Sequence, residues 1–235
     1  MSSVIWYDTL ASTMIEAARL ARDGAPTGTV VAAKSQTAGQ GRQGREWISK
    51  SGDGLYCTFI LRLTILPADL PSITLALGLA VVEAITPFLG AALDIRWPND
   101  VLWQGKKLCG ILARLEDSAV LAGIGINLNQ LAFPEDLRTP AVSMRMATGQ
   151  VYRPEEVLES LHTPIEHFAN LGRQPVLRLF TQASSYVSGR RVTVDLDGLM
   201  LEGVTDGLDE FGFLKIRKED GTHATVFAGS VRPAN

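Results

Sequence analysis

Residues 34–47 read K-S-Q-T-A-G-Q-G-R-Q-G-R-E-W and follow a run of small and β-branched residues typical of a strand. Glycine lets a backbone approach a ligand and adopt positive φ, and successive N–H groups in such turns form an anion nest. The arginines add planar forks for phosphate or carboxylate. The spacing is neither a P-loop nor G-x-G-x-x-G opening a helix. A flexible surface loop is the alternative, but Trp47 and Leu55 favour a binding loop because they would tie its ends to a core.

A second stretch, residues 96–110, reads R-W-P-N-D-V-L-W-Q-G-K-K-L-C-G. Pro98 fixes its own φ and biases Trp97 toward extended backbone. Two short polar side chains, Asn99 and Asp100, follow at this restricted turn. The stretch therefore predicts a rigid turn that presents polar groups, followed by a short strand and a second turn.

Lys106 and Lys107 open an apolar run over residues 108–115. Alternation along a strand sends the two lysines to opposite faces. One should be solvated and the other should point toward the glycine loop. The alternative is a pair of ordinary surface lysines at a hairpin.

Composition limits the classes of function. The chain has 235 residues and a formal net charge of −3, which allows a sizeable core plus one small module and disfavours nucleic acid as a partner. Cys57 and Cys109 lie in apolar runs without C-x-x-C spacing and predict buried thiols in a reducing compartment. The three histidines lack zinc-site spacing, so no structural metal is expected.

The N-terminal sequence has no basic region followed by an apolar one, so no signal peptide is expected. The longest apolar stretch, residues 73–82, is shorter than the ~20 residues that a membrane helix needs. A cytoplasmic protein with no membrane partner is therefore predicted.

Ser12 and Thr13 open a predicted helix that Gly24 ends. Thr13 and Glu16 have capping-box spacing. An N-cap role is thus a structural explanation for these hydroxyls, and it is compatible with binding because a helix N-terminus presents N–H groups and hydroxyls to a polar ligand.

Other elements follow from apolar patterning. Strands are predicted over residues 4–7, 29–33, 54–63, 93–96, 108–116 and 119–126, and helices over 70–89, 154–171 and 176–186. Pro164 predicts a kink or break in its helix. The hairpin of residues 108–126 could pair edge to edge in a dimer, so a monomer and a homodimer both stay open.

Composition changes at Ser188-Gly189, after which short β runs alternate with Asp-Gly turns about every ten residues. This spacing predicts a small barrel, with a simple β appendage as the alternative.

The motifs G-x-G-R-x-G-R-x-W and W-P-N-D-x(6)-K-L-x-G-I-L, with Ser-Thr upstream, resemble those of the bacterial biotin protein ligases. The resemblance covers residues 4–231. It implies an α+β fold, in which helices flank a mixed β-sheet like that of class II synthetases. It also implies a small C-terminal SH3-like β-barrel, with a catalytic domain over residues 1–187 and a second domain over 188–235.

The resemblance also implies an activity with ATP and biotin as substrates and Mg²⁺ as cofactor. Biotin carboxylate would attack the α-phosphorus of ATP to give biotinyl-5′-AMP. A lysine of a biotin carrier domain, for example in a subunit of acetyl-CoA carboxylase, would then attack the adenylate. Lys107 and Arg42 are the catalytic residues it implies, because cations offset repulsion between two anions.

The remaining site residues are assigned by the resemblance and by the chemistry of biotin, whose ureido ring needs donors and acceptors. The predicted biotin-binding residues are Ser12, Thr13, Met14, Gln36, Gly39, Gln40, Gly41, Arg42, Lys107 and Gly110. The predicted ATP-binding residues are Arg42, Arg45, Trp47, Asn99, Lys107 and Asn127, and no residue is assigned to a metal. Trp47 is expected to be core packing that orders the loop, and Asp100 either holds Mg²⁺ indirectly or orders its turn.

Two departures from the family pattern and one absence matter. Met14 stands where the family usually has Asn, and Gln40 where it usually has Arg. The catalytic region begins almost at residue 1, which leaves no room for the DNA-binding domain of many relatives. A ligase that is not a repressor is expected.

Two other functions remain open. One is a lipoate or octanoate ligase or transferase of the same fold. The other is a catalytically silent biotin-binding protein.

Overall fold

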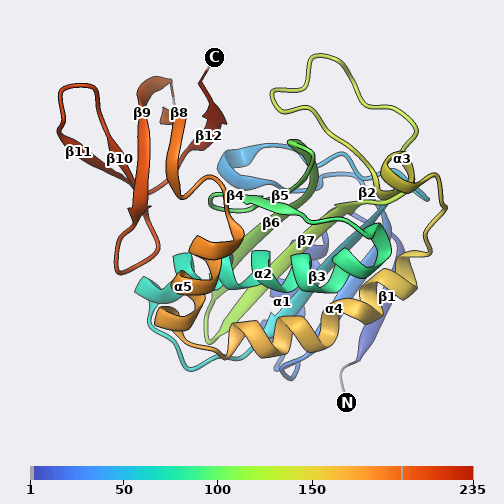
Figure 1. Ribbon diagram of the computed structural model, residues 1–235. Helices are drawn as coiled ribbons and strands as arrows, with labels where there is room; N and C mark the ends of the chain where they lie inside the picture. Colours follow the sequence, from blue (N-terminus) through green and yellow to red (C-terminus); the bar gives the residue numbers. More distant parts are fainter. Residues whose placement is uncertain (1–2, 197, 235) are drawn as a thin grey trace.

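The computed structural model describes residues 3–196 and 198–234 (Figure 1). Its larger part is a seven-stranded sheet in the order β1-β2-β3-β7-β6-β5-β4, and its smaller part is a five-stranded sheet in the order β11-β10-β9-β8-β12. Only the pair β1–β2 is parallel in the larger sheet. The predicted α+β class with a mixed sheet is confirmed.

The strands of the large sheet are β1 (Val4–Leu10), β2 (Thr29–Gln36), β3 (Gly54–Leu61), β4 (Asp94–Arg96), β5 (Asp100–Trp103), β6 (Lys106–Glu116) and β7 (Ala119–Asn127). The α-helices are α1 (Thr13–Arg22), α2 (Leu70–Leu89), α3 (Met144–Thr148), α4 (Pro154–Ala169) and α5 (Arg173–Ala183), with 3₁₀ turns at Arg42–Gly44 and Pro67–Asp69. The C-terminal strands are β8 (Ser188–Leu196), β9 (Leu199–Leu208), β10 (Leu214–Arg217), β11 (His223–Val226) and β12 (Ser230–Pro233).

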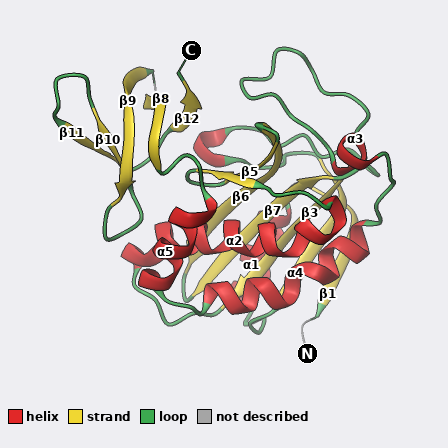
Figure 2. Ribbon diagram, in the orientation of Figure 1, coloured by secondary structure: helices red, strands yellow, loops and turns green. Residues whose placement is uncertain are grey.

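Helices cover both faces of the large sheet. Helix α1 packs on one face through Met14, Ala17, Ala18 and Ala21, and α2 and α4 cover the other face (Figure 2). Because side chains alternate along a strand, Ile124 and Ile126 of β7 enter the core beneath α2. Their neighbours on β7 are glycines, which leave the α1 face open.

Helix α2 is the central core helix. With the turn before it, residues Pro67–Leu89 are long and apolar enough to span a membrane by length and composition, but 61% of the most apolar window is buried inside the protein. The length argument from residues 73–82 was therefore wrong, because the helix extends in both directions. Packing between the sheet and its neighbouring helices accounts for its apolar character.

The C-terminal module is an SH3-like antiparallel sheet, as predicted, although β12 was not expected as a strand. Its core is continuous with that of the larger part, including Val192, Val194 and Leu214. Trp97 Nε1 donates a hydrogen bond of 2.9 Å to the Gly212 carbonyl. The rigid turn after β4 thus holds the module against the seven-stranded sheet.

One local prediction was wrong, and two others are not decided by the fold. Ser12, not Thr13, is the N-cap of α1, and Glu16 instead accepts bonds from Tyr7 and Arg19. Helix α4 continues through Pro164 to Ala169, so it does not break there, and the kink that was the other expected outcome stays a prediction. The edge-to-edge pairing of the β6–β7 hairpin in a dimer stays a prediction, because β5 pairs with β6 only over residues 106–110 and no described strand covers residues 112–116 on that side.

Candidate active site

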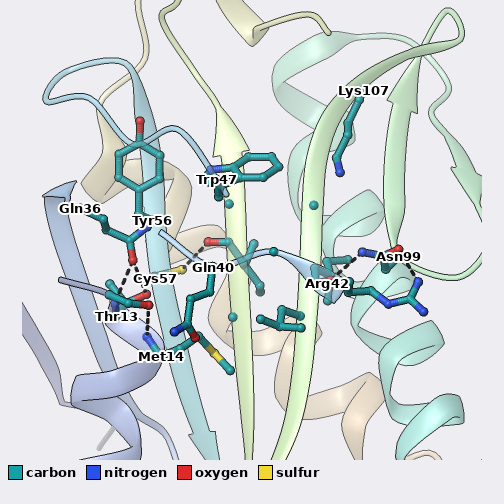
Figure 3. A pocket seen from close by; sticks show the side chains of 18 residues that line it. Thr13, Met14, Gln36, Gln40, Arg42, Trp47, Tyr56, Cys57, Asn99 and Lys107 are labelled. Atoms are coloured by element: carbon teal, nitrogen blue, oxygen red, sulfur yellow. Dashed lines mark hydrogen bonds between the residues drawn. The ribbon is translucent and has the colours of Figure 1, made fainter. Parts of the chain in front are cut away.

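A pocket lies on the α1 face of the large sheet, above three glycines (Figure 3). Gly110 of β6 pairs with Gly125 of β7, and Gly123 is two residues back along β7. A Cβ on Gly125 would lie 2.5 Å from Trp47 Cε2, and one on Gly123 would lie 2.7 Å from Met14 Sδ. Only glycine therefore leaves room for large groups to lie flat on the sheet.

The pocket brings together residues that are far apart in the sequence, from Ser12 to Gly125. Its lining contains the predicted residues Ser12, Thr13, Met14, Gln36, Gln40, Gly41, Arg42, Trp47, Asn99, Lys107 and Gly110. It also contains Tyr56, Cys57, Ile111, Leu112, Gly123, Ile124 and Gly125, which sequence reasoning did not assign. The sequence G-I-G-I-N did carry a signal for Gly123 and Gly125. Glycine at alternate positions removes the side chains from one face of a strand, which allows a ligand or another segment to approach that face closely.

One end of the pocket is neutral and polar. Gln36 Oε1 accepts from Thr13 N at 2.8 Å and from Thr13 Oγ1 at 3.2 Å, and Gln36 Nε2 donates to Ser49 Oγ at 2.8 Å. Thr58 Oγ1 donates to Thr13 Oγ1, and Ser49 Oγ donates to the Trp47 carbonyl, both at 2.9 Å. This chain of hydrogen bonds fixes the helix N-terminus and the end of the glycine loop in one arrangement.

The resemblance implies that this end of the pocket binds biotin. Replacing Gln36 by leucine should then raise the biotin concentration for half-maximal activity roughly tenfold and lower stability by about 1–3 kcal/mol, because Thr13 N and the Ser49 hydroxyl lose their partner in a partly buried place. Steady-state kinetics and thermal unfolding measure the two effects. The control is Gln182→Leu, an exposed glutamine of α5. Unchanged biotin dependence in Gln36→Leu would show that this end of the pocket does not contact biotin.

The other end carries the cations. Lys107 Nζ lies 2.6 Å from Asp100 Oδ1, and Arg96 Nη2 lies 2.5 Å from Asp100 Oδ2. Although burial opposes ionisation, the charges of Lys107 and Arg96 hold the pKa of the Asp100 carboxyl below its ordinary value. Both oxygens of Asp100 are thus engaged, which makes it the anchor of Lys107 and of the turn.

A β-bulge aims Lys107 at the pocket. The β5–β6 register pairs Val101 with Cys109 but Leu102 with Lys107, so Leu108 is the extra residue. Strict alternation would place Lys107 on the core side with Cys109. The bulge instead puts it on the same face as Gly110, whose Cβ would lie 3.2 Å from Lys107 Nζ. Lys106 is exposed.

Arg42 is positioned by the restricted turn. Its Nη1 donates to Asn99 Oδ1 at 3.0 Å, and Asn99 Nδ2 donates to the Ile111 carbonyl at 2.8 Å. Burial lowers the pKa of the Arg42 guanidinium from its ordinary value, while the nearby Asp100 charge raises it. A partly desolvated guanidinium interacts more strongly with an arriving anion than an exposed one does.

Trp47 lies in the pocket and not in the core, which corrects the expectation of core packing (Figure 3). Its indole rests on Gly110 and Gly125, and Lys107 Nζ is 5.2 Å from the ring centroid. Its Nε1 is buried without a hydrogen-bond partner among the described residues. The indole therefore forms a wall of the pocket between its polar and cationic ends.

Comparison with known proteins identifies the family. Residues 8–130 match the biotin/lipoate A/B protein ligase family, and residues 187–231 match the biotin protein ligase C-terminal domain. The chain belongs to the biotin/lipoate A/B protein ligase family. The resemblance drawn from the two motifs is confirmed.

Similar family members include the bifunctional ligase/repressor BirA of Bacillus subtilis, with 34% identity over 229 residues, 93% of this chain and 70% of that protein. The biotin–[acetyl-CoA-carboxylase] ligase of Paracoccus denitrificans is 31% identical over 236 residues, 93% of this chain and 97% of that protein. The structure of the biotin protein ligase from Aquifex aeolicus in complex with biotin and ATP aligns with a TM-score of 0.86, 30% identity and 100% coverage of both chains.

Three residues that the family pattern assigned do not line the pocket. Gly39 packs its backbone against the Trp47 carbonyl, and Arg45 donates to Ser230 Oγ at 2.6 Å. Asn127 Nδ2 donates to the carbonyls of Lys107 at 3.2 Å and Val142 at 3.1 Å. Their roles in binding biotin or ATP stay predictions, and in this structure they hold backbone or neighbouring segments.

The two departures from the family pattern lie beside each other. Met14 is buried above Gly123, and the Gln40 side chain extends toward it (Figure 3). An apolar thioether and a neutral amide thus replace two groups of higher polarity. The cationic character of the pocket therefore depends on Arg42 and Lys107.

Proposed function

We propose that this chain is an ATP-dependent biotin protein ligase. In the first step, an oxygen of biotin carboxylate bonds to the α-phosphorus of ATP, and the bond to the β-phosphate breaks to release pyrophosphate. In the second step, a lysine amine of a biotin carrier domain attacks the acyl carbon. The bond to the phosphate breaks, AMP leaves and the amine loses a proton.

The observation that carries this proposal is the order of groups along the glycine floor. The neutral hydrogen-bonding end contains Ser12, Thr13 and Gln36, and the cationic end contains Arg42 and Lys107. Biotin has the same order, with a neutral ureido ring, an apolar tail and a terminal carboxylate. The ring would bind at the polar end, and the tail would pass Trp47 to bring the carboxylate to the cations.

The first step joins two anions, so their repulsion and the charge on the transferred phosphorus must be offset. Lys107 would bridge carboxylate and α-phosphate oxygens as an electrostatic clamp, and Arg42 would supply a planar fork. Asp100 and Asn99 would position these two cations, because each already holds one of them. We also propose that the remaining residues assigned by the family pattern contact the two substrates. Biotin would be contacted by Met14, Gly39, Gln40, Gly41 and Gly110, and ATP by Arg45, Trp47, Asn99 and Asn127.

Mg²⁺ would reduce the phosphate charge when it is bound with ATP. Among the described residues, no three His, Cys, Asp or Glu side chains converge to hold a metal, and Asp100 is engaged by two cations. We therefore propose that the ion enters on the nucleotide phosphates, as Mg²⁺ usually does.

Several broader assignments belong to the same proposal. The carrier would be a biotin carrier domain of a carboxylase, and the location would be the cytoplasm, which the two buried free thiols support. The division into residues 1–187 and 188–235 is supported by β8, which begins at Ser188. The ligase would work as a monomer or a homodimer, and analytical ultracentrifugation measures the mass that distinguishes the two.

Pyrophosphate release on adding biotin, ATP and Mg²⁺ tests the proposal, with lipoate and octanoate as matched acids. Of the three acids, we expect only biotin to give pyrophosphate release. We also expect the mass of biotinyl-AMP to be retained on the protein. Release only with lipoate or octanoate would favour the related acyl ligases. Binding of biotin without any pyrophosphate would favour a silent biotin-binding protein.

Arg42→Ala should raise the concentrations of both biotin and ATP for half-maximal activity, by roughly 10-fold each, because a hydrogen bond to a charged group contributes about 1.5–3 kcal/mol. Asn99→Ala should act in the same direction with a smaller effect, since it loosens Arg42 without removing its charge. Titrations of initial rate against each substrate provide the measurement. A change confined to one substrate would contradict a position between the two anions.

A further inference from the structure

The C-terminal module presents two polar residues side by side toward the catalytic domain. Ser230 of β12 is the direct register partner of Asp195 on β8. Gly229 makes this pairing close, because a Cβ there would lie 2.9 Å from the Asp195 carbonyl oxygen. The two side chains therefore form one cross-strand pair, here called the Ser230/Asp195 pair.

Ser230 contacts the glycine loop. Arg45 Nη1 donates to Ser230 Oγ at 2.6 Å, although the residues are 185 positions apart. The loop that begins after β2 and carries Arg42 is thereby attached to the C-terminal module.

Asp195 contacts a second loop, residues 128–143 between β7 and α3. Arg138 Nη1 lies 3.6 Å from Asp195 Oδ2, and Asp195 Oδ1 accepts from Gly198 N at 2.9 Å. The Gly198 N–H therefore helps to orient the carboxylate that faces Arg138. In Figure 1, β12 lies close to both loops.

The second loop also touches the catalytic lysine directly. Lys107 N donates to the Pro140 carbonyl at 2.7 Å, and Val142 N donates to the Lys107 carbonyl at 3.0 Å. Arg96, which anchors Asp100, donates to Thr139 Oγ1 at 3.0 Å. Movement of this loop would therefore disturb the backbone of Lys107 and the anchor of its side chain.

We propose that the Ser230/Asp195 pair is a brace that holds two loops closed beside the acyl-adenylate: the glycine loop through Arg45, and the loop of residues 128–143, which supports Lys107, through Arg138. This inference rests on the proposed ligase function. The pair contacts no reacting atom, so both members are positioning residues. The pair would help the enzyme to retain the acyl-adenylate, because a loop that opens admits water, which hydrolyses this mixed anhydride.

The brace suits a two-step enzyme. Each contact is individually weak, since an exposed ion pair or hydrogen bond at a surface contributes little. Two weak contacts on one rigid strand pair restrain both loops together and still release them when the carrier domain arrives. Stronger contacts would protect the adenylate better, but they would slow its transfer to the carrier domain.

The test compares Ser230→Ala, Asp195→Asn and the double variant with the unmodified protein. Thr193→Ala is the matched control, because it lies on β8 one alternation from Asp195 and pairs with Arg232. Arg138→Gln breaks the second contact from the loop side and leaves the module intact. Two measurements are made: hydrogen exchange of residues 37–47 and 130–142 in the ligand-free protein, and loss of biotinyl-AMP after gel filtration without carrier.

We expect Ser230→Ala to raise exchange in residues 37–47, and both Asp195→Asn and Arg138→Gln to raise it in 130–142. The double variant should lose adenylate roughly tenfold faster, the combined range of such contacts, while Thr193→Ala should match the unmodified protein. Unchanged exchange in both loops of the folded double variant would overturn the brace. Failure of the unmodified protein to form an adenylate would overturn the ligase function instead, and the exchange measurement would still decide on the brace.

Discussion

Lys107→Ala should lower the rate of biotin adenylation by about 10²- to 10³-fold, the range found when one preorganised group that stabilises developing charge is removed. The reason is geometric as well as electrostatic. Lys107 Nζ is held 2.6 Å from Asp100 at the cationic end of the pocket, so the charge is in place before the anions arrive. Single-turnover formation of biotinyl-AMP measures the effect without interference from transfer.

Lys106→Ala is the matched control, because it removes a neighbouring charge that is exposed. We expect its adenylation rate to stay within about twofold of the unmodified enzyme, as surface substitutions usually have small effects. Equal losses in both variants would mean that net charge, and not the clamp, supports the reaction. Near-normal turnover in Lys107→Ala would remove this residue from the mechanism.

Gly125→Val should raise the biotin requirement by about 5- to 150-fold, because the displaced indole would occupy space in the pocket and returning it to its place costs about 1–3 kcal/mol of overpacking. A Cβ at this position would lie 2.5 Å from Trp47 Cε2 and 2.6 Å from Trp47 Nε1. The indole must leave the glycine floor, and the wall between the two ends of the pocket is lost. Isothermal titration with biotin gives the affinity directly.

A second substitution separates this effect from general unfolding. Gly125→Ala adds a single carbon, which meets the Trp47 indole. Combining it with Trp47→Ala removes the indole atoms that this carbon meets. The double variant should therefore bind biotin better than Gly125→Ala if the indole transmits the effect. No recovery in the double variant would place the contact between Gly125 and biotin itself.

The sequence predicted the fold class and most elements because their signals are local. Glycine and β-branched runs marked β2 and β3, and Asp-Gly turns marked the C-terminal strands. Apolar patterning placed α2 at its observed bounds, Leu70–Leu89. Strand β12 was missed, because its four residues have no alternating pattern and are defined by pairing with β8.

The candidate site was predicted in its chemistry more than in its arrangement. The hydroxyls at the start of α1, the glycine loop and the W-P-N-D turn all contribute to one pocket. Their joint position depends on hydrogen bonds such as Thr13 to Gln36, which connect segments without any shared pattern. The glycines at 123 and 125 carried a signal, yet their meaning depended on Met14 and Trp47 lying above them.

The sequence by itself determined which groups are available: three cations, a run of glycines and a polar helix start, because residue type and spacing set local backbone and charge. Only the tertiary structure decided where they point. Lys107 faces the pocket because Leu108 is an extra residue against β5, and Arg45 faces the C-terminal module because Ser230 lies on a strand that folds back beside it. Register and long-range contact depend on two chain segments at once, so neither can be read from one of them alone.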